Sequence, residues 1–226
     1  DYTLNQGYIE SGNEHGLRVL STLAASRSDF QGAVPNASYL LFTTEDASPG
    51  AEHRVEEYNW LFAAEAADSA GVDIISSSLG YYTFEESSMD YTYADMDGST
   101  AVISIAAGMA YDRGIVVITS AGNQGNKAWK YITAPADHES VLAVGAVNNS
   151  LGYANFSSVG PNSVQTMKPD LAAFGNGTAT INDTGQVELG NGTSFAAPLV
   201  SGLVAGLMQK FPNQSYTEII RAVKAS

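Results

Sequence analysis

The chain of 226 residues contains no cysteine. This absence excludes disulfide bonds, zinc sites built from thiolates and catalysis by a cysteine nucleophile. Histidine is also scarce, and His15, His53 and His138 are too scattered along the sequence to predict a zinc site. We therefore expect chemistry that needs no metal and no other cofactor, and the sequence leaves open only a structural calcium ion.

Basic residues are few. Ten Lys and Arg stand against 24 Asp and Glu, which gives a formal net charge of −14 at pH 7. Nucleic acids and anionic membranes are bound by basic surfaces, so neither is an expected partner. No apolar run approaches the roughly eighteen residues that span a bilayer, and the first residues lack the basic start and apolar core of a signal peptide. Any targeting information is therefore expected outside this chain.

The distribution of apolar residues predicts one α/β domain over residues 1–226. Hydrophobic residues make up 44% of the chain, enough for a sizeable core. Short runs rich in Val, Ile and Leu alternate with helical patterns, which predicts a parallel sheet with helices on both faces. The expected helices lie near 15–26, 52–70, 99–113, 194–211 and 215–225, and the expected strands near 38–44, 72–78, 114–120 and 141–147. We expect a loop or hairpin over 175–191, and a solvated charged helix face at His53, Glu56 and Glu57.

The most informative segment runs from Gly192 to Pro198. It reads Gly-Thr-Ser-Phe-Ala-Ala-Pro and continues into an apolar helical pattern. Proline is tolerated in a first helical turn, so we expect the helix to begin at or near Ser194. The Ser194 hydroxyl would then lie where free backbone N–H groups and the helix dipole stabilise an oxyanion. In isolation, such a serine is usually an ordinary helix cap.

Two further segments change that interpretation. His15 stands at the start of an apolar helical run, where its ring can face a cleft. Asn123 follows the strand expected over 114–120, and an asparagine side-chain N–H₂ at a strand end is a suitable oxyanion donor. The three segments together, in the order His, Asn, Ser, resemble the subtilase family of subtilisin-like serine endopeptidases.

The resemblance covers nearly the whole chain, from about Gly12 to about Ala225. Matching segments also lie at 33–41, 72–80, 141–147, 156–161 and 168–170. The histidine motif departs from the family, which usually has His-Gly-Thr-His where this chain has His15-Gly16-Leu17-Arg18. The catalytic histidine position is retained, but its surroundings change.

One part of the family pattern is absent. The subtilase triad runs Asp, His, Ser, with the Asp roughly thirty residues before the His, whereas only fourteen residues precede His15. Asp1 is followed by Tyr2-Thr3 rather than by Ser-Gly or Thr-Gly, so we do not assign it as the triad acid. We expect the acid and the first strand of the sheet to lie upstream, and the domain to be truncated at both ends.

The resemblance implies a role for each motif. Ser194 would be the nucleophile, His15 the general base and Asn123 the oxyanion donor. The segments implied to bind substrate are Ser78, Leu79 and Gly80 on one side and Ala121 and Gly122 on the other. Their small or apolar side chains predict a preference for uncharged, medium or large apolar P1 residues.

The resemblance also implies partners and a location. The substrate would be a peptide or protein, and a propeptide or a complementary N-terminal fragment is left open as a further partner. Subtilases of this kind act in extracellular, periplasmic or cell-surface locations.

Two alternatives compete with the endopeptidase. A catalytically incompetent subtilase-like binding or structural module is favoured by the missing Asp and by Arg18, and opposed by the retention of His15, Asn123 and Ser194. An α/β-hydrolase esterase is disfavoured because Ser194 is not in a Gly-X-Ser-X-Gly elbow and no histidine follows residue 138.

Overall fold

The computed structural model describes residues 14–46 and 52–226. Its helices are α1 (His15–Ala24), α2 (Val55–Ala70), α3 (Val102–Asp112), α4 (Thr193–Lys210) and α5 (Tyr216–Lys224), with two short 3-10 turns, η1 (Ser87–Met89) and η2 (Tyr93–Asp95). Its strands are β1 (Ile74–Ser77), β2 (Val116–Ser120), β3 (Leu142–Val147), β4 (Leu171–Phe174), β5 (Asn176–Ile181) and β6 (Val187–Asn191). All five expected helices are present.

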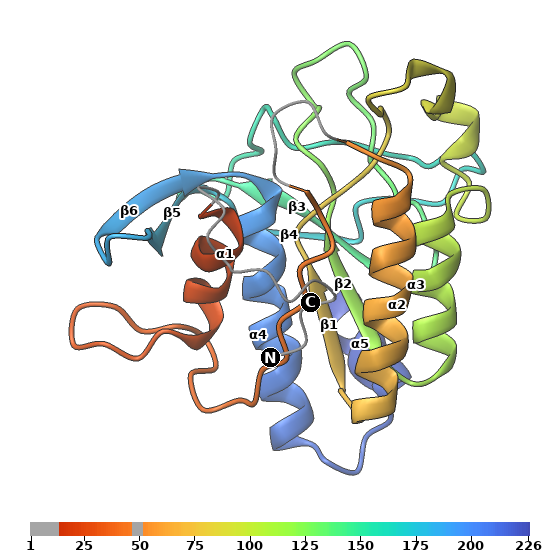
Figure 1. Ribbon diagram of the computed structural model, residues 1–226. Coiled ribbons are helices and arrows are strands. Elements are labelled where there is room, and N and C mark those ends of the chain that lie inside the picture. The colour runs from red at the N-terminus through yellow and green to blue at the C-terminus, as the bar shows by residue number, and fades with distance from the viewer. Residues whose placement is uncertain (1–13, 47–51) are drawn as a thin grey trace.

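The main sheet is parallel, with the strand order β1-β2-β3-β4. Helices α2 and α3 lie side by side on one flank of this sheet, and α4 and α1 lie on the other, as Figure 1 shows. The β5–β6 hairpin is antiparallel and projects beside α1. The fold class predicted from the sequence, a parallel sheet between helices, is confirmed.

Alternate residues of β2 explain why both faces of the sheet are covered. Val116 and Ile118 point to the face where α4 and α5 pack, whereas Val117 points to the face of α2 and α3. All three side chains are fully buried. A strand that is apolar on both faces is what a parallel sheet between two helical layers requires.

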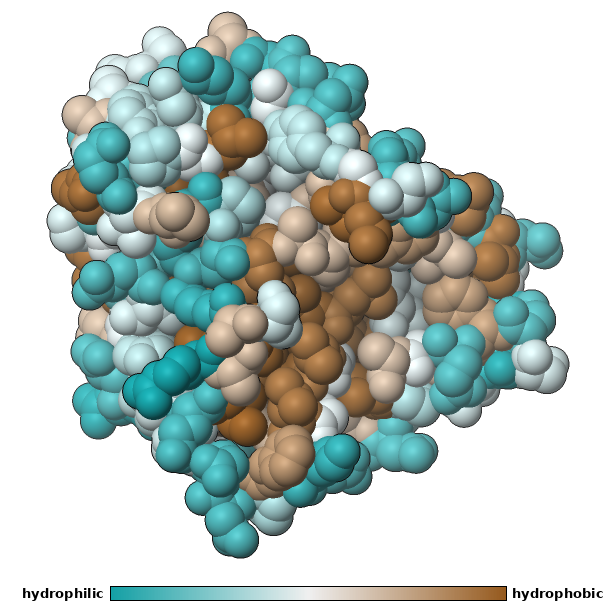
Figure 2. Space-filling view, turned by 180° about the vertical axis from the view of Figure 1, so that it is seen from behind, coloured by the Kyte–Doolittle hydropathy of each residue, from teal (hydrophilic) through white to brown (hydrophobic). Residues whose placement is uncertain are grey.

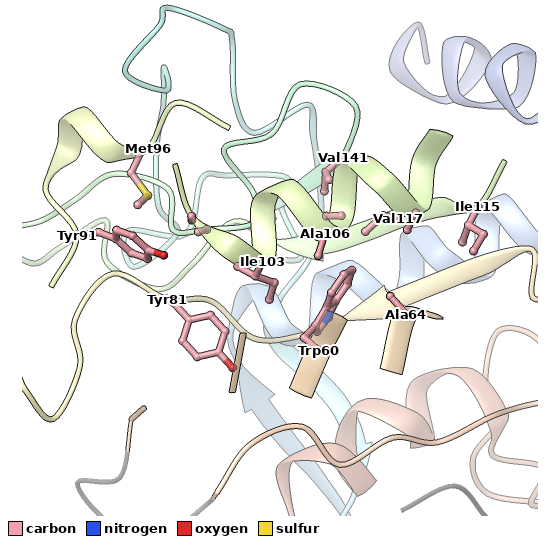
Figure 3. Close-up of a cluster of buried hydrophobic side chains, with 14 of the residues drawn as sticks. Trp60, Ala64, Tyr81, Tyr91, Met96, Ile103, Ala106, Ile115, Val117 and Val141 are labelled. Carbon is pink, nitrogen blue, oxygen red and sulfur yellow. The ribbon is translucent and has the colours of Figure 1, made fainter. Parts of the chain in front are cut away.

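Aromatic side chains dominate the core on the α2–α3 side. Figure 3 shows Trp60 of α2 between the sheet and Ile103 of α3, with Tyr81 and Tyr91 beside them. The Trp60 indole N–H donates to the Ser77 hydroxyl at 2.9 Å, so its polar atom is satisfied inside the core. This bond fixes α2 against the end of β1.

Three expectations about local structure need correction. The strand expected over 38–44 does not form, and Leu40 and Leu41 are 38% and 48% exposed. A strand needs a hydrogen-bonding neighbour, and β1, the outer strand of the sheet on this side, pairs with β2 alone among the described strands. Conversely, β4 forms where no strand was expected, because β3 offers it a parallel partner.

The expectation of a solvated charged face on α2 is also wrong for its two glutamates. Glu56 and Glu57 are 2% and 0% exposed. The Glu56 carboxylate accepts the His53 N–H at 2.8 Å, and the Glu57 carboxylate accepts the Tyr91 hydroxyl at 3.0 Å. Burial raises the pKa of Glu57, and hydrogen bonds from the Ile103 N–H and the Tyr91 hydroxyl partly offset this rise. These two carboxylates therefore organise the interior rather than the surface; His53 itself is exposed.

The face opposite to that of Figure 1 carries a broad apolar band bordered by polar residues (Figure 2). Among the described helices, none is long and apolar enough to cross a membrane. A hollow of about 350 Å³ lies between β4, α4 and α5 and is lined by apolar residues such as Leu171, Leu199 and Leu203. Its lining includes none of His15, Asn123 and Ser194.

Candidate active site

Ser194 lies at the start of α4, which begins one residue earlier, at Thr193. The preceding Gly192 has a φ of 159° and a ψ of 148°, a backbone conformation that residues with a Cβ rarely adopt. Amides in the first helical turn have no acceptor within the helix, so the Ser194 N–H is available to a ligand. With 8% of its surface exposed, Ser194 lies just below the molecular surface.

A proline four residues later shapes the surroundings of Ser194. Pro198 lies inside α4 and has no N–H, so it cannot donate to the Ser194 carbonyl as a helical residue at this position would. The Ser78 hydroxyl donates to that carbonyl instead, at 2.8 Å. The segment that follows β1 is thereby tied to the backbone of the candidate nucleophile.

Asn123 is held against the same helix start by Thr193. The Asn123 Oδ1 accepts the Thr193 N–H at 2.9 Å and the Thr193 hydroxyl at 3.0 Å. In turn, the Gly122 N–H approaches the Thr193 Oγ1 at 3.2 Å. A backbone N–H can only donate, so the oxygen of the Asn123 amide must face Thr193 and its N–H₂ must face away.

The Asn123 N–H₂ lies over the turn that leads into Ser194. A Cβ built on Gly192 would be 3.7 Å from the Asn123 Nδ2. Two donors, the Asn123 N–H₂ and the Ser194 N–H, therefore lie near the turn at Gly192, each 3.7 Å from an ideal Cβ there. Paired donors of this kind stabilise the oxyanion that forms when a serine attacks a carbonyl group.

His15 reaches this site from α1. It is the first residue of that helix, and its ring centroid lies 6.1 Å from that of Phe195, the residue after Ser194. Burial and, secondarily, the charge of Arg18 lower the pKa of His15. The imidazole is therefore neutral at pH 7, which is the form that can accept a proton.

The implied substrate-binding segments leave the sheet side by side. Strands β1 and β2 are parallel, with Ser77 opposite Thr119, so Ser78–Gly80 and Ala121–Gly122 emerge at the same edge. The Ser120 hydroxyl joins the two by donating to the Leu79 carbonyl at 3.2 Å. Within residues 14–46 and 52–226, the N–H groups of Leu79 and Gly80 have no acceptor, so an extended peptide could pair with them.

Comparison with known proteins shows the family of this chain. A model of the subtilase family matches residues 1–225. The chain belongs to the subtilase family. Subtilisin DY of Bacillus licheniformis is 32% identical over 222 residues, which are 96% of this chain and 72% of that protein. The chain is therefore a member of the subtilisin-like serine protease class.

Other similar proteins are longer than this subtilase chain. Subtilisin NAT of Bacillus subtilis subsp. natto is 31% identical over 93% of this chain, which spans about half of that relative, 49%. Among solved structures, sphericase superposes with a TM-score of 0.75 and 26% identity, over 95% of this chain and 69% of that one. These relatives support the fold and the serine protease class.

Thr133 is a site residue that the sequence motifs of this subtilase did not reveal. It is 2% exposed, and its hydroxyl lies 2.2 Å from an ideal Cβ on Gly80 and 3.0 Å from one on Gly122. The hydroxyl has no hydrogen-bond partner within the described residues. Thr133 therefore fills the space between the two implied substrate-binding segments.

The motifs also missed two connecting hydroxyls, those of Thr193 and Ser78. The Thr193 hydroxyl joins Asn123 to α4, and the Ser78 hydroxyl joins the substrate-binding segment to Ser194. In the sequence, only Pro198 signals the bond from Ser78, because a proline at this position leaves the Ser194 carbonyl without its usual helical donor. Asp1 lies outside the described residues, and within the described part no group of three or more His, Asp or Glu side chains could hold a metal ion.

Proposed function

We propose that this chain is the catalytic domain of a serine endopeptidase, incomplete at its ends, with Ser194 as the nucleophile. The observation that carries the proposal is the clamp of the Asn123 amide onto Thr193, which turns its oxygen to Thr193 and holds its N–H₂ donor beside the Gly192 turn that leads into Ser194. A serine with two oxyanion donors and a neutral imidazole nearby has the groups that acyl transfer requires.

The proposed reaction has two halves. The Ser194 Oγ attacks the scissile carbonyl while its proton passes to His15, and the carbonyl oxygen takes the negative charge facing Asn123 and the Ser194 N–H. His15 then gives the proton to the leaving amine as the C–N bond breaks. In the second half, water takes the place of Ser194 and the same groups release the acid product. No cofactor enters these steps.

The test is covalent labelling of Ser194 by a fluorophosphonate probe. We expect labelling of the protein and none of Ser194→Ala with its fold intact. Ser201→Ala is the matched control, because Ser201 lies two turns further along α4, where its hydroxyl bonds to the Ala197 carbonyl and to the Ser76 hydroxyl. Undiminished labelling of Ser194→Ala would identify another nucleophile and overturn the proposal.

The triad Asp is proposed to lie upstream of residue 1. Two features support a further strand beside β1: β1 is an outer strand of the described sheet, and the nearby segment 38–44 has strand-forming side chains without strand pairing. An Asp holds the tautomer of the catalytic His and stabilises the imidazolium, and its removal costs about 10⁴ in kcat.

Comparing this chain with a longer chain of the same gene product tests that proposal. We expect slow turnover from the 226 residues and an increase approaching about 10⁴-fold when an upstream Asp-Ser-Gly or Asp-Thr-Gly strand is included. Equal and robust activity of both chains would mean that the acid comes from elsewhere.

A second candidate function is a subtilase-like module that binds peptides without cutting them. The observation that favours it is Arg18, whose charge opposes the imidazolium that catalysis must form on His15. Absence of fluorophosphonate labelling in both the shorter and the longer chain would favour this function.

We further propose peptide or protein substrates with uncharged apolar P1 residues, because the walls around Leu79, Gly80, Ala121 and Gly122 carry no charge. The net charge of −14 supports partners other than nucleic acids and anionic membranes. An extracellular, periplasmic or cell-surface location, and a propeptide or complementary N-terminal fragment as a partner, follow from the family resemblance.

A further inference from the structure

Arg18 lies one helical turn after His15, and its guanidinium joins three elements. Its Nε donates to the Thr180 hydroxyl of β5 at 2.9 Å, and its NH2 donates to the Leu189 carbonyl of β6 at 3.4 Å. Its NH1 donates to the Glu14 carboxylate at 3.2 Å, directly before α1. The side chain thus fixes the first turn of α1 to the β5–β6 hairpin.

The same guanidinium also contacts the ring that His15 faces. The Arg18 Cζ lies 5.6 Å from the centroid of Phe195, and the His15 ring lies 6.1 Å from that centroid. Gly190 makes this packing possible, since a Cβ there would lie 2.6 Å from the Phe195 ring and 3.1 Å from the Arg18 NH2. Phe195 is therefore enclosed by His15, Arg18 and the hairpin.

From these contacts we propose that Arg18 is a positioning residue that holds His15 at the first turn of α4 and favours its neutral, proton-accepting form. The proposal rests on the proposed function for its catalytic consequence. Its structural part stands on the contacts, and its electrostatic part on the position of the Arg18 charge, one helical turn from His15 and against the same Phe195 ring. Arg suits this role because its planar guanidinium donates hydrogen bonds in several directions at once. Lys carries the same charge on one compact ammonium group.

The charges around His15 make the direction of the effect clear. Among the described residues, those on α1 and its N-cap are Arg18 and Glu14, and those on the hairpin are Glu188 and Asp183; residues 192–195 at the start of α4 carry none. Glu188 lies 3.9 Å from the Arg18 NH1, and Glu14 accepts the Asp183 N–H at 3.0 Å, so both carboxylates are engaged away from His15. Among these groups, Arg18 is the charge that lowers the pKa of His15.

Three variants separate the effect of the positive charge of Arg18 from the effect of its planar guanidinium, which donates several hydrogen bonds. Arg18→Gln removes both, Arg18→Lys keeps only the charge, and Arg27→Gln is the matched control. Arg27 also contacts the hairpin, by donating to the Gly185 carbonyl, and it forms an ion pair with Asp29, two residues along the chain. Its guanidinium does not take part in the ring contacts described for Phe195.

The first measurement is an NMR titration of the three histidines, in which the His15 signal is the one lost in His15→Gln. We expect Arg18→Gln to move the His15 midpoint to higher pH, while Arg18→Lys and Arg27→Gln leave it near the wild-type value. An unmoved midpoint in Arg18→Gln would overturn the electrostatic part. This readout does not depend on catalysis.

The second measurement is the pH dependence of fluorophosphonate labelling at Ser194. We expect Arg18→Gln and Arg18→Lys both to lower the plateau rate by about 10- to 100-fold through loss of positioning, and only Arg18→Gln to move the acid limb to higher pH. A wild-type plateau in both variants would overturn the positioning role. A wild-type protein that is not labelled, yet shows the expected histidine shift, would count against the proposed function and support the electrostatic role of Arg18.

Discussion

The two halves of the candidate site are held in place by different forces. Around Ser194, the contacts are neutral hydrogen bonds between residues at strand ends and a helix start, namely Asn123 with Thr193 and Ser78 with the Ser194 carbonyl. Around His15, the contacts involve charge: a guanidinium, carboxylates and an aromatic ring.

This difference teaches how each half responds to change. Neutral hydrogen bonds between rigid elements fix geometry and depend little on pH or salt. Charged contacts on a hairpin and a short helix depend on protonation and on ionic screening. The half of the site around Ser194 should therefore be sensitive to substitutions that remove a single hydrogen-bonding atom. The half around His15 should be sensitive to pH and salt concentration.

The largest effects are expected from loss of the Asn123 N–H₂ donor, beginning with Asn123→Ala. Loss of one oxyanion donor should lower kcat by about 10²–10³ with little change in KM, because the donor acts on charge that forms in the transition state. Steady-state kinetics on a peptide amide substrate would measure the split between kcat and KM.

Asn123→Asp sharpens that prediction. An Asp retains oxygens that accept from the Thr193 N–H and hydroxyl, so the clamp persists while the N–H₂ donor is lost. We expect at least as large a loss of kcat as in Asn123→Ala, with a melting temperature near the wild-type value. Near wild-type kcat in Asn123→Asp would make the clamp, not the donor, the function of Asn123.

A smaller effect is expected from Ser78→Ala, which leaves the Ser194 carbonyl without its donor. An unsatisfied buried carbonyl costs about 1–3 kcal/mol, so the melting temperature should fall, and kcat should fall by about tenfold as the helix start relaxes. Ser76→Ala is the matched control, because the Ser76 hydroxyl bonds to Ser201 further along the same helix. We expect it to change stability without changing kcat; equal kcat values for the two variants would reduce Ser78 to a structural role.

The sequence predicted the layers of the fold and the positions of the motifs because both depend on local patterns. Buried parallel strands are apolar on both faces, as in β2, and the Gly192–Pro198 segment determines its own helix start. The strand expected over 38–44 failed because pairing depends on a neighbour that local propensity does not specify. The buried carboxylate of Glu57 was missed because two of its donors, the Tyr91 hydroxyl and the Ile103 N–H, are distant in sequence.

The contacts that orient the site were mostly beyond sequence reasoning for the same reason. Arg18 was recognised as a departure from the family motif, but its partners Thr180 and Leu189 lie more than 160 residues away. Thr133 carries no motif at all and became visible only through its position between Gly80 and Gly122.

Thr133 should limit the size of the P1 side chain. We expect the wild-type preference to be for uncharged apolar residues, and Thr133→Gly to raise kcat/KM for large P1 residues relative to Ala by about tenfold, since one methylene in a pocket is worth about 1–3 kcal/mol. Profiling with a peptide library would measure both. A strict preference of the wild-type protein for Arg, Lys, Asp or Glu would contradict the neutral walls, and an unchanged size preference in the variant would place the pocket elsewhere.

The smallest expected effect distinguishes the two halves by pH. Burial, and then Arg18, lower the pKa of His15 below its ordinary value of 6.5, so the folded protein binds fewer protons at this site than the unfolded chain. The contribution of His15 to the free energy of unfolding is therefore full above about pH 7 and declines as the pH falls through 6.5 toward the lower folded pKa.

Urea unfolding at intervals from pH 8 to pH 5 should show the wild-type protein losing stability relative to His15→Gln. Other titrating groups, including His138, are shared by both proteins and cancel in the difference. The curve of unfolding free energy against pH for Asn123→Ala, which changes only the half around Ser194, should run parallel to that of the wild type. Parallel curves for His15→Gln and the wild type would show that His15 is not held in its neutral form.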